Sequence, residues 1–125
     1  MAALTLLCYL LALALVVVGI MGLVFPEALS GLYGVRAQDA ASHGYVRATS
    51  IRDIGIGVAL AIAAYAHVLL LLITLTAIGL VISFADFAIV FKAQGKRIGA
   101  SHAGHAAGAI AFIVALAMAL CAIGR

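Results

Sequence analysis

A short charged segment, SIRDIGIG at residues 50–57, places an arginine and an aspartate side by side inside an apolar run. Asp86 interrupts a second apolar run, and two histidines lie three residues apart near the start of a third. Carboxylates and imidazoles exchange protons, and a guanidinium stabilises developing negative charge. These residue types indicate an acid–base site. The candidate catalytic residues are Arg52, Asp53, Asp86, His102 and His105.

Further polar side chains lie close to the edges of the same apolar runs. They offer hydroxyl groups, a carboxylate and a guanidinium, which can hydrogen-bond to a molecule bound nearby. The candidate substrate-binding residues are Glu27, Tyr45, Arg47, Thr49 and Ser83.

The composition is that of a membrane protein. Of the 125 residues, 68% are apolar and 9% are charged, whereas a typical soluble domain has about 25% charged residues. The basic residues behind the net charge of +3 flank the apolar runs and form no patch, so we expect no nucleic-acid partner. Cys8 and Cys121 form no CxxC, which argues against a thiol redox motif or a zinc ribbon. The expected partners are the lipid bilayer and a lipophilic small molecule, and a homo-oligomer is left open.

The apolar runs predict an all-α protein, an integral membrane four-helix bundle with antiparallel helices. A span needs about 20 apolar residues, so the length fits four spans in one transmembrane domain over residues 1–125. A short interfacial helix is expected after the first span, because Pro26 suits a helix start and apolar residues recur at helical spacing until Gly34. A turn near His67 is required, since one helix through both middle runs would be about 70 Å long. The predicted spans are about 3–25, 45–65, 68–91 and 100–123, with a loop over 36–44.

Antiparallel connectivity brings most of the polar residues to one end of the bundle. Asp53 lies about 12 Å along a helix from Tyr45, and Asp86 lies about 9 Å from Lys92, so neither is at headgroup level. A charged residue at the bilayer centre costs about 2.5–3.5 kcal/mol, and such residues normally face the bundle interior and pair with one another. The predicted network is therefore internal.

The pairing within this network follows from helix geometry. Arg52 and Asp53 diverge by about 100° around their helix, so we expect each to reach a different helix. Arg52 would pair with Asp86 or Glu27. Asp53 would pair with a histidine of the last span or with Arg47. The glycines expected to let the helices approach closely are Gly55, Gly57, Gly79, Gly104 and Gly108.

The distribution of Lys and Arg predicts the orientation in the membrane. The side with the first and third connections carries the larger positive charge, and the opposite side carries only Arg125 beside the N-terminus. We therefore predict a multi-pass protein of the cell membrane, with both termini outside the cytoplasm and a polar pocket toward the cytoplasm. The basic residues of the cytoplasmic side are Arg36, Arg47, Lys92, Lys96 and Arg97.

A buried network of arginine and aspartate is compatible with three kinds of function. An acid–base enzyme uses the carboxylates as base and acid. A non-catalytic membrane subunit or scaffold uses the same ion pairs to fix its helix packing. A proton-linked transporter uses them as a relay, although four spans would need an oligomer. An open pocket with unpaired carboxylate oxygens favours the enzyme, whereas a closed and fully paired network favours the subunit.

Metal chemistry and serine hydrolysis are less well supported by the motifs. His102 and His105 share one helical face and would suit a metal if an aspartate completed the site. The chain lacks the Glu-x-x-His repeats of carboxylate-bridged metal bundles, so we expect no metal and no other cofactor. It also lacks the GxSxG elbow of serine hydrolases.

Four segments together resemble a known family. The order PEALSGLYGV, SIRDIGIG, FADFAIV and SHAGHAAG resembles that of the small bacterial and fungal membrane proteins of domain of unknown function 4267. More distantly, the size and the polar start of the second span resemble DoxX-like proteins. The resemblance covers nearly the whole chain and implies a four-helix fold, with Arg52, Asp53 and Asp86 as motif positions.

A second resemblance concerns the chemistry alone. Limonene-type epoxide hydrolases open epoxides with an Asp–Arg–Asp set that positions a water, and Asp53, Arg52 and Asp86 supply the same group types on an unrelated fold. We therefore expect a small membrane enzyme acting on a lipophilic molecule. Epoxide hydrolysis is the most concrete reaction, and isomerisation or cyclisation would need the same acid–base pair.

Overall fold

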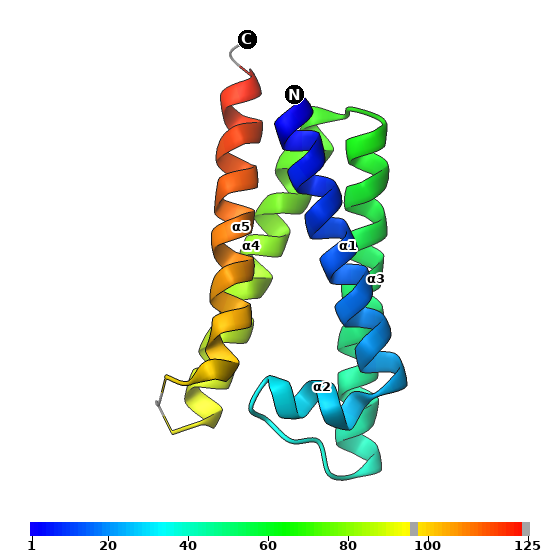
Figure 1. The fold of residues 1–125 in the computed structure, drawn as a ribbon, viewed down its shortest axis with the longest axis vertical. Helices are drawn as coiled ribbons and strands as arrows, with labels where there is room; N and C mark the ends of the chain where they lie inside the picture. Colours follow the sequence, from blue (N-terminus) through cyan, green and yellow to red (C-terminus); the bar gives the residue numbers. More distant parts are fainter. Residues whose placement is uncertain (96–97, 124–125) are drawn as a thin grey trace.

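The computed structural model describes residues 1–95 and 98–123, and the regular secondary structure within these ranges is entirely helical. The four long helices are each long and apolar enough to cross a membrane. A short helix follows the first of them, as expected (Figure 1). The predicted all-α membrane bundle is confirmed. The helices are α1 (Ala2–Val24), α2 (Pro26–Leu32), α3 (Ala40–Tyr65), α4 (Leu69–Ala93) and α5 (Ala100–Ile123).

The long helices pack as two pairs. α1 makes its most extensive contacts with α3, and α4 makes its most extensive contacts with α5. Contacts between the two pairs are fewer. The start of α1 and the end of α5 lie at one end of the bundle, while α2 and the start of α3 lie at the other end (Figure 1). The chain is therefore two helix pairs, each made of consecutive long helices.

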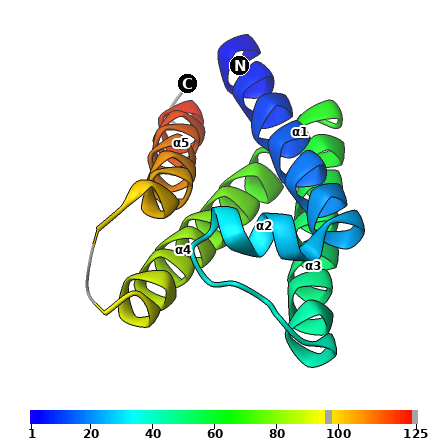
Figure 2. The same ribbon diagram turned by 60° about the horizontal axis from the view of Figure 1, so that its bottom comes forward.

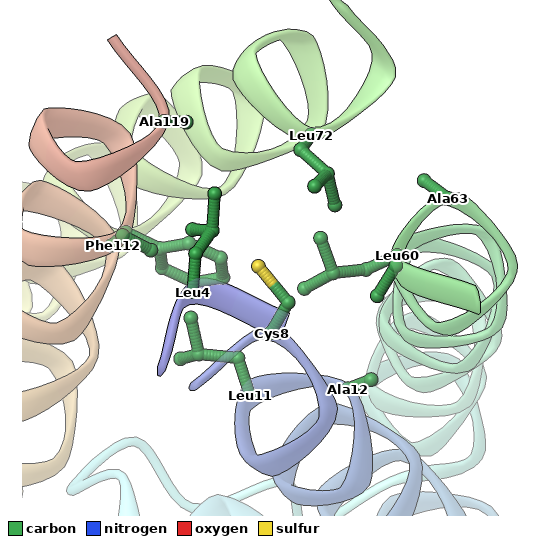
Figure 3. Close-up of a cluster of buried hydrophobic side chains, with 11 residues drawn as sticks. Leu4, Cys8, Leu11, Ala12, Leu60, Ala63, Leu72, Phe112 and Ala119 are labelled. Carbon is green, nitrogen blue, oxygen red and sulfur yellow. The ribbon is translucent and has the colours of Figure 1, made fainter. Parts of the chain in front are cut away.

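The apolar core lies at the end of the bundle that carries the start of α1 and the end of α5. Leu4 and Cys8 of α1 contact a cluster that includes Leu60 of α3, Leu72 of α4 and Phe112 of α5 (Figure 3). In a membrane such packing stabilises through van der Waals contact, because the lipid tails are as apolar as leucine. The two pairs are thus joined by apolar packing at one end, and the polar residues occupy the other.

Glycines on α1 allow its close approach to α3. A Cβ atom at Gly19 would lie 2.7 Å from the backbone oxygen of Ser50, and one at Gly22 would meet the Ser50 side chain. On α3, a Cβ at Gly57 would lie 2.8 Å from the backbone oxygen of Ala12. Small residues at these contacts let the two backbones pack directly against each other.

The expected set of close-packing glycines is only partly correct. Gly57 lies at the contact between α1 and α3, and Gly79 of α4 faces the ring of Phe112. A Cβ atom at Gly55 or at Gly104 would meet nothing within 4 Å, so these two glycines do not mediate a close helix contact.

The helix boundaries follow local capping signals. α3 begins at Ala40 and not near residue 45, so the expected loop over 36–44 is wrong in its second half. Asp39 and Ser42 form a capping box: Asp39 Oδ1 accepts a hydrogen bond from Ser42 N–H at 2.7 Å, and Ser42 Oγ accepts one from Asp39 N–H at 3.2 Å. The box satisfies two backbone donors and starts the helix early.

The predicted turn at His67 is confirmed. His67 has a φ of 53°, in the left-handed region, although it is not a glycine. The N–H groups of His67 and Val68 bond to the carbonyls of Ala64 and Ala63 at 3.4 and 3.1 Å, which is the Schellman pattern that ends helices. The turn therefore closes α3 without the glycine that usually marks such an end.

Candidate functional site

A cavity of about 620 Å³ lies between the two helix pairs, on the α2 side of the apolar core. This volume is in the range of small-molecule sites. Figure 2 shows α2 running from the α3 side toward α4, across this part of the bundle. The wall is mostly apolar, with polar side chains grouped near α2. The apolar lining includes Leu11, Leu15, Val18, Ile56, Ile82, Ile89 and Phe112.

The two carboxylates of the cavity come from different helix pairs and share one arginine. Arg52 Nη2 donates to Asp53 Oδ1 at 3.1 Å and to Asp86 Oδ2 at 3.4 Å. Arg52 Nε also donates to Asp53 Oδ1, at 3.2 Å. The expected contact between Arg52 and Asp86 is confirmed. One nitrogen atom therefore links α3 to α4.

The expected pairing of Asp53 is wrong, and Glu27 is not the partner of Arg52. Asp53 bonds to its neighbour Arg52 and makes no hydrogen bond to a histidine or to Arg47. The Cα–Cβ directions of adjacent residues do diverge, but the arginine side chain is long enough to curve around the helix to the next carboxylate. Glu27 lies elsewhere, in a separate groove beside α2.

One oxygen of each carboxylate stays without a protein partner. Asp53 Oδ2 and Asp86 Oδ1 accept no hydrogen bond from any described residue, and neither is fully shielded from solvent. The Asp53 and Asp86 side chains are 16% and 29% exposed, against 38% for Arg52. Arg52 does not line the cavity. Arg52 therefore contacts the two carboxylates from outside the cavity. Both carboxylates line the cavity, and each has one oxygen atom without a hydrogen bond from a described residue.

A tyrosine that the sequence did not single out completes the polar end. Tyr33 directly follows α2, and its ring lies 4.7 Å from the ring of His105, centroid to centroid. Both residues line the cavity. His105 Nε2 is buried without a hydrogen-bond partner among the described residues. The signal that could have revealed Tyr33 is its spacing from Leu29 and Ser30, since these residues share the inward face of the short helix.

The phenol of Tyr33 is held in its protonated form. Burial, together with the smaller effect of the negative charges of Asp53 and Asp86, raises the pKa of Tyr33 to about 12. The hydroxyl is therefore a hydrogen-bond donor at neutral pH. No described residue accepts a hydrogen bond from it, so this donor is available to a bound molecule.

His102, a candidate catalytic residue, lies outside the cavity lining. Its side chain is buried against the rings of Phe87 and Phe91, at centroid distances of 5.1 and 6.1 Å. His102 Nδ1 accepts a hydrogen bond from the backbone N–H of Gly99 at 3.1 Å. This bond satisfies a backbone donor at the start of α5. His102 therefore positions α5, while His105, one turn later, faces the cavity.

The five candidate substrate-binding residues divide between two places. Tyr45, Thr49 and Ser83 line the cavity, and Thr49 Oγ1 donates to the Tyr45 carbonyl at 2.9 Å. Glu27 and Arg47 line a separate groove. Arg47 Nε donates to the carbonyl of Leu23 at 3.3 Å, which satisfies an acceptor at the end of α1.

The sequence matches the family described as "Domain of unknown function (DUF4267)" over residues 12–120. This chain belongs to the DUF4267 family. The matched region includes both cavity carboxylates, Arg52, Tyr33 and His105. No curated protein and no solved structure matches the sequence. The family description names no activity, so the function of this DUF4267 protein has to follow from its geometry.

The connection after α2 joins the two helix pairs at the polar end of the DUF4267 bundle. Ser30 Oγ accepts a hydrogen bond from Ala37 N–H at 3.0 Å, which folds this connection back on α2. Gln94 Nε2, just after α4, donates to the carbonyl of Gly34 at 3.2 Å and to Ser101 Oγ at 2.7 Å. These bonds hold Tyr33 beside α5, where it meets His105.

A metal site does not form among the residues of this DUF4267 chain that the structure describes. Within residues 1–95 and 98–123, no three His, Cys, Asp or Glu side chains are grouped so that they could hold an ion. The two histidines that share one helical face have different surroundings, since His102 bonds to the backbone at the start of α5 and His105 lines the cavity.

Proposed function

We propose that this protein is a small integral membrane enzyme that performs acid–base chemistry on a lipophilic small molecule. Asp53 and Asp86 are its reacting carboxylates. One observation carries the proposal: a single guanidinium holds two carboxylates at the polar end of an apolar cavity, and each carboxylate keeps one oxygen unpaired. A purely structural ion network gains most when all its groups are paired.

Epoxide hydrolysis is the most concrete reaction for this set of groups. One carboxylate takes a proton from a water molecule while the water oxygen bonds to an epoxide carbon. The carbon–oxygen bond of the ring breaks, and the other carboxyl group, protonated beforehand, gives its proton to the ring oxygen. The product is a vicinal diol. Proton exchange with solvent then restores the starting state of the pair. Isomerisation or cyclisation would use the same acid and base without adding water.

Tyr33 would assist at the ring oxygen. Its pKa of about 12 keeps the phenol protonated, and Tyr33 lines the same cavity as both carboxylates. A donor placed where negative charge develops lowers the barrier, because its dipole is already oriented before the reaction. Arg52 would act as a positioning residue, since it contacts both carboxylates and lies outside the cavity lining.

The cavity sets the class of substrate. Its apolar wall and volume of about 620 Å³ suit a molecule with a hydrocarbon body and one reactive polar group. Such a molecule dissolves in the bilayer, and the four helices that could cross a membrane surround the cavity. The substrate would therefore reach the cavity from the lipid phase.

We further propose that the protein is a multi-pass protein of the cell membrane with this polar end toward the cytoplasm. Arg36, Arg47 and Lys92 support that orientation, because they lie beside α2 or at the end of α4. Lys96, Arg97 and Arg125, which also entered the orientation argument, lie outside the described residues. Both termini would then lie on the opposite side.

The test is conversion of lipophilic epoxides by the purified full chain in mild detergent. We expect a vicinal diol from at least one member of a panel of terpene and fatty-acyl epoxides, with ¹⁸O from labelled water in the product. Asp53→Asn and Asp86→Asn should each lower the rate by about 10²–10⁴-fold. Asp39→Asn is the matched control, since Asp39 is a carboxylate outside the cavity. Diol formation that survives both cavity substitutions would refute the proposal.

Thermal unfolding of the same variants distinguishes a catalytic role of the two carboxylates from a purely structural role. Removing one partner of a buried structural pair costs about 3–5 kcal/mol, whereas relieving a functional site is often neutral or stabilising. We expect the melting temperature to stay unchanged or to rise. A large fall for both variants, with no diol from the parent chain, would assign the network to a non-catalytic subunit.

A further inference from the structure

A second hollow lies where α1 ends, α2 begins and α3 starts. It has a volume of about 720 Å³ and shares no lining residue with the cavity. Its polar lining consists of Arg36, His43, Arg47 and Glu27. The apolar part includes Val24 and Phe25, which are 58% and 62% exposed. This groove therefore combines positive charge with exposed hydrocarbon surface.

Both arginines of the groove have N–H groups that form no hydrogen bond with a described residue. Arg47 uses Nε for the carbonyl of Leu23, and its two terminal nitrogens bond to no described residue. Arg36 forms neither an ion pair nor a hydrogen bond with any described residue. A guanidinium offers parallel N–H groups that match two oxygens of a phosphate group. Two such side chains in one groove form a favourable phosphate-binding arrangement.

We propose that this groove binds the phosphate group of an anionic glycerophospholipid, with Arg36 and Arg47 as the phosphate-binding residues. The position supports a lipid as the source of the phosphate, because the groove lies at the end of α1, a helix able to cross the membrane. Anionic lipid headgroups are concentrated at that depth, and they attract basic residues near the membrane surface. Val24 and Phe25 would contact the glycerol and the first acyl carbons, which a free phosphate ion does not possess.

Glu27 gives the groove a distinctive charge balance. Its carboxylate lines the same hollow and pairs with neither arginine in the described structure. It opposes a bound phosphate, so its neutralisation should strengthen binding while loss of an arginine weakens it. General attraction to an anionic membrane would also give these opposite signs, so the local site is distinguished by comparison with Lys92, a basic residue outside the groove.

A lipid in this groove would also act on α2. Glu27 of this helix lines the groove, while Leu29 and Ser30 of the same helix line the cavity. Binding on one face would therefore hold the helix that leads to Tyr33. This consequence does not depend on which reaction the cavity performs.

The experiment is thermal unfolding of the full chain in mild, uncharged detergent, titrated with dioleoyl phosphatidylglycerol. Phosphatidylcholine, phosphatidylethanolamine and inorganic phosphate are titrated in parallel. We expect phosphatidylglycerol to raise the melting temperature and the other three to have little effect. A shift as large with inorganic phosphate would overturn the lipid assignment. An equal or larger shift with either of the other phospholipids would overturn the preference for an anionic headgroup.

The variants test the residues. Arg36→Gln and Arg47→Gln should each raise the lipid concentration needed for a half-maximal shift by about tenfold or more, the loss expected for a charge-assisted hydrogen bond. Glu27→Gln should lower it. Lys92→Gln is the control, since Lys92 is a basic residue in the last turn of α4 and outside the groove. If Arg47→Gln fails to fold, because Arg47 also bonds to α1, Arg36→Gln and Glu27→Gln carry the test. An unchanged response in Arg36→Gln, or an equal loss in Lys92→Gln, would contradict the proposed site.

Discussion

Arg52 can hold two carboxylates because its guanidinium is planar and carries several N–H groups. Nε and Nη2 both donate to Asp53, and Nη2 also donates to Asp86. A lysine supplies the same charge from a single compact ammonium group, and it lacks the fork geometry. The charge alone therefore does not reproduce the arrangement.

We predict that Arg52→Lys lowers the rate of epoxide opening by about tenfold or more, and that Arg52→Gln lowers it further. The expected loss corresponds to one or two charge-assisted hydrogen bonds. The rate of diol formation by each variant, at saturating substrate, is the measurement. Full activity in Arg52→Lys would show that positive charge suffices and that the shared contact is unimportant.

Tyr33 should make stability depend on pH in the alkaline range. Its pKa is raised from the ordinary value of 10 to about 12 in the folded protein, by burial and by the two aspartates. The unfolded chain therefore loses the Tyr33 proton first. The stabilisation is fully present below pH 10 and is lost as the pH rises toward about 12.

We predict that Tyr33→Phe reduces the fall in melting temperature between pH 10 and pH 12. Unfolding scans in detergent at several pH values, for the parent and the variant, measure this difference. Tyr65→Phe is the control, because Tyr65 is 79% exposed. Identical pH profiles for the parent and Tyr33→Phe would contradict the assigned environment.

The sequence indicated the two carboxylates of the candidate site, but it did not predict the hydrogen-bond partner of Asp53. Asp53 and Asp86 were recognisable because a carboxylate in an apolar run is costly unless it faces the bundle interior. Tyr33 was missed, since a tyrosine at the end of a short interfacial helix usually marks only the membrane boundary. The role of His102 depends on how the chain folds back at Gly99, and residue type alone does not reveal that contact.

At the scale of elements, the contact between α1 and α3 depends on glycines, which have no side chain to separate the two backbones. We predict that Gly22→Val lowers the stability by about 1–3 kcal/mol, the usual cost of overpacking, because the added carbons meet Ser50 and Leu29. Gly55→Val is the matched control, since nothing lies within 4 Å of that position. Melting temperatures of the two variants should differ clearly, and equal values would contradict the observed packing.

The first turn of α3 depends on the capping box at Asp39. Hydrogen bonds from Ser42 hold the pKa of Asp39 below its ordinary value. The cap therefore stabilises the helix above the ordinary pKa, and this contribution is lost as the pH falls through the lowered value. The early start of α3 at Ala40, which the sequence did not predict, is therefore stabilised in a pH-dependent way.

We predict that Asp39→Ala speeds amide hydrogen exchange in the first turn of α3, over residues 40–44, and leaves the middle of the helix unchanged. Hydrogen–deuterium exchange followed by mass spectrometry measures this difference at neutral pH. Asp39→Asn should retain most of the protection, since asparagine is also a good N-cap residue. Equal exchange in the parent and Asp39→Ala would show that the box is dispensable.

At the scale of the whole molecule, apolar packing and polar chemistry occupy opposite ends. The sequence predicted this separation, because antiparallel spans bring alternate helix ends to the same side. It did not predict how the helices pair. Periodicity does not discriminate among the faces of a helix that is apolar all round, so the pairing of α1 with α3 and of α4 with α5 emerges only from the fold.

The orientation in the membrane gives a prediction for the intact molecule. In a chain that carries Cys8→Ser and Cys121→Ser, His67→Cys should react with a membrane-impermeant maleimide in intact cells. Gln38→Cys in the same background should react only after the membrane is opened, because the proposed orientation places the more basic side toward the cytoplasm. The reversed labelling pattern would show that the protein has the opposite orientation in the membrane. The geometry of the site would not be affected by that result.

The two carboxylates that we propose as reacting groups belong to different helix pairs. Asp53 belongs to the first pair and Asp86 to the second, and the turn at His67 is the only covalent connection between the pairs. A gene split at this turn would encode two hairpins, each with a single carboxylate. Neither fragment would contain a complete site, so recovered activity after co-expression would report the association of two separate membrane peptides.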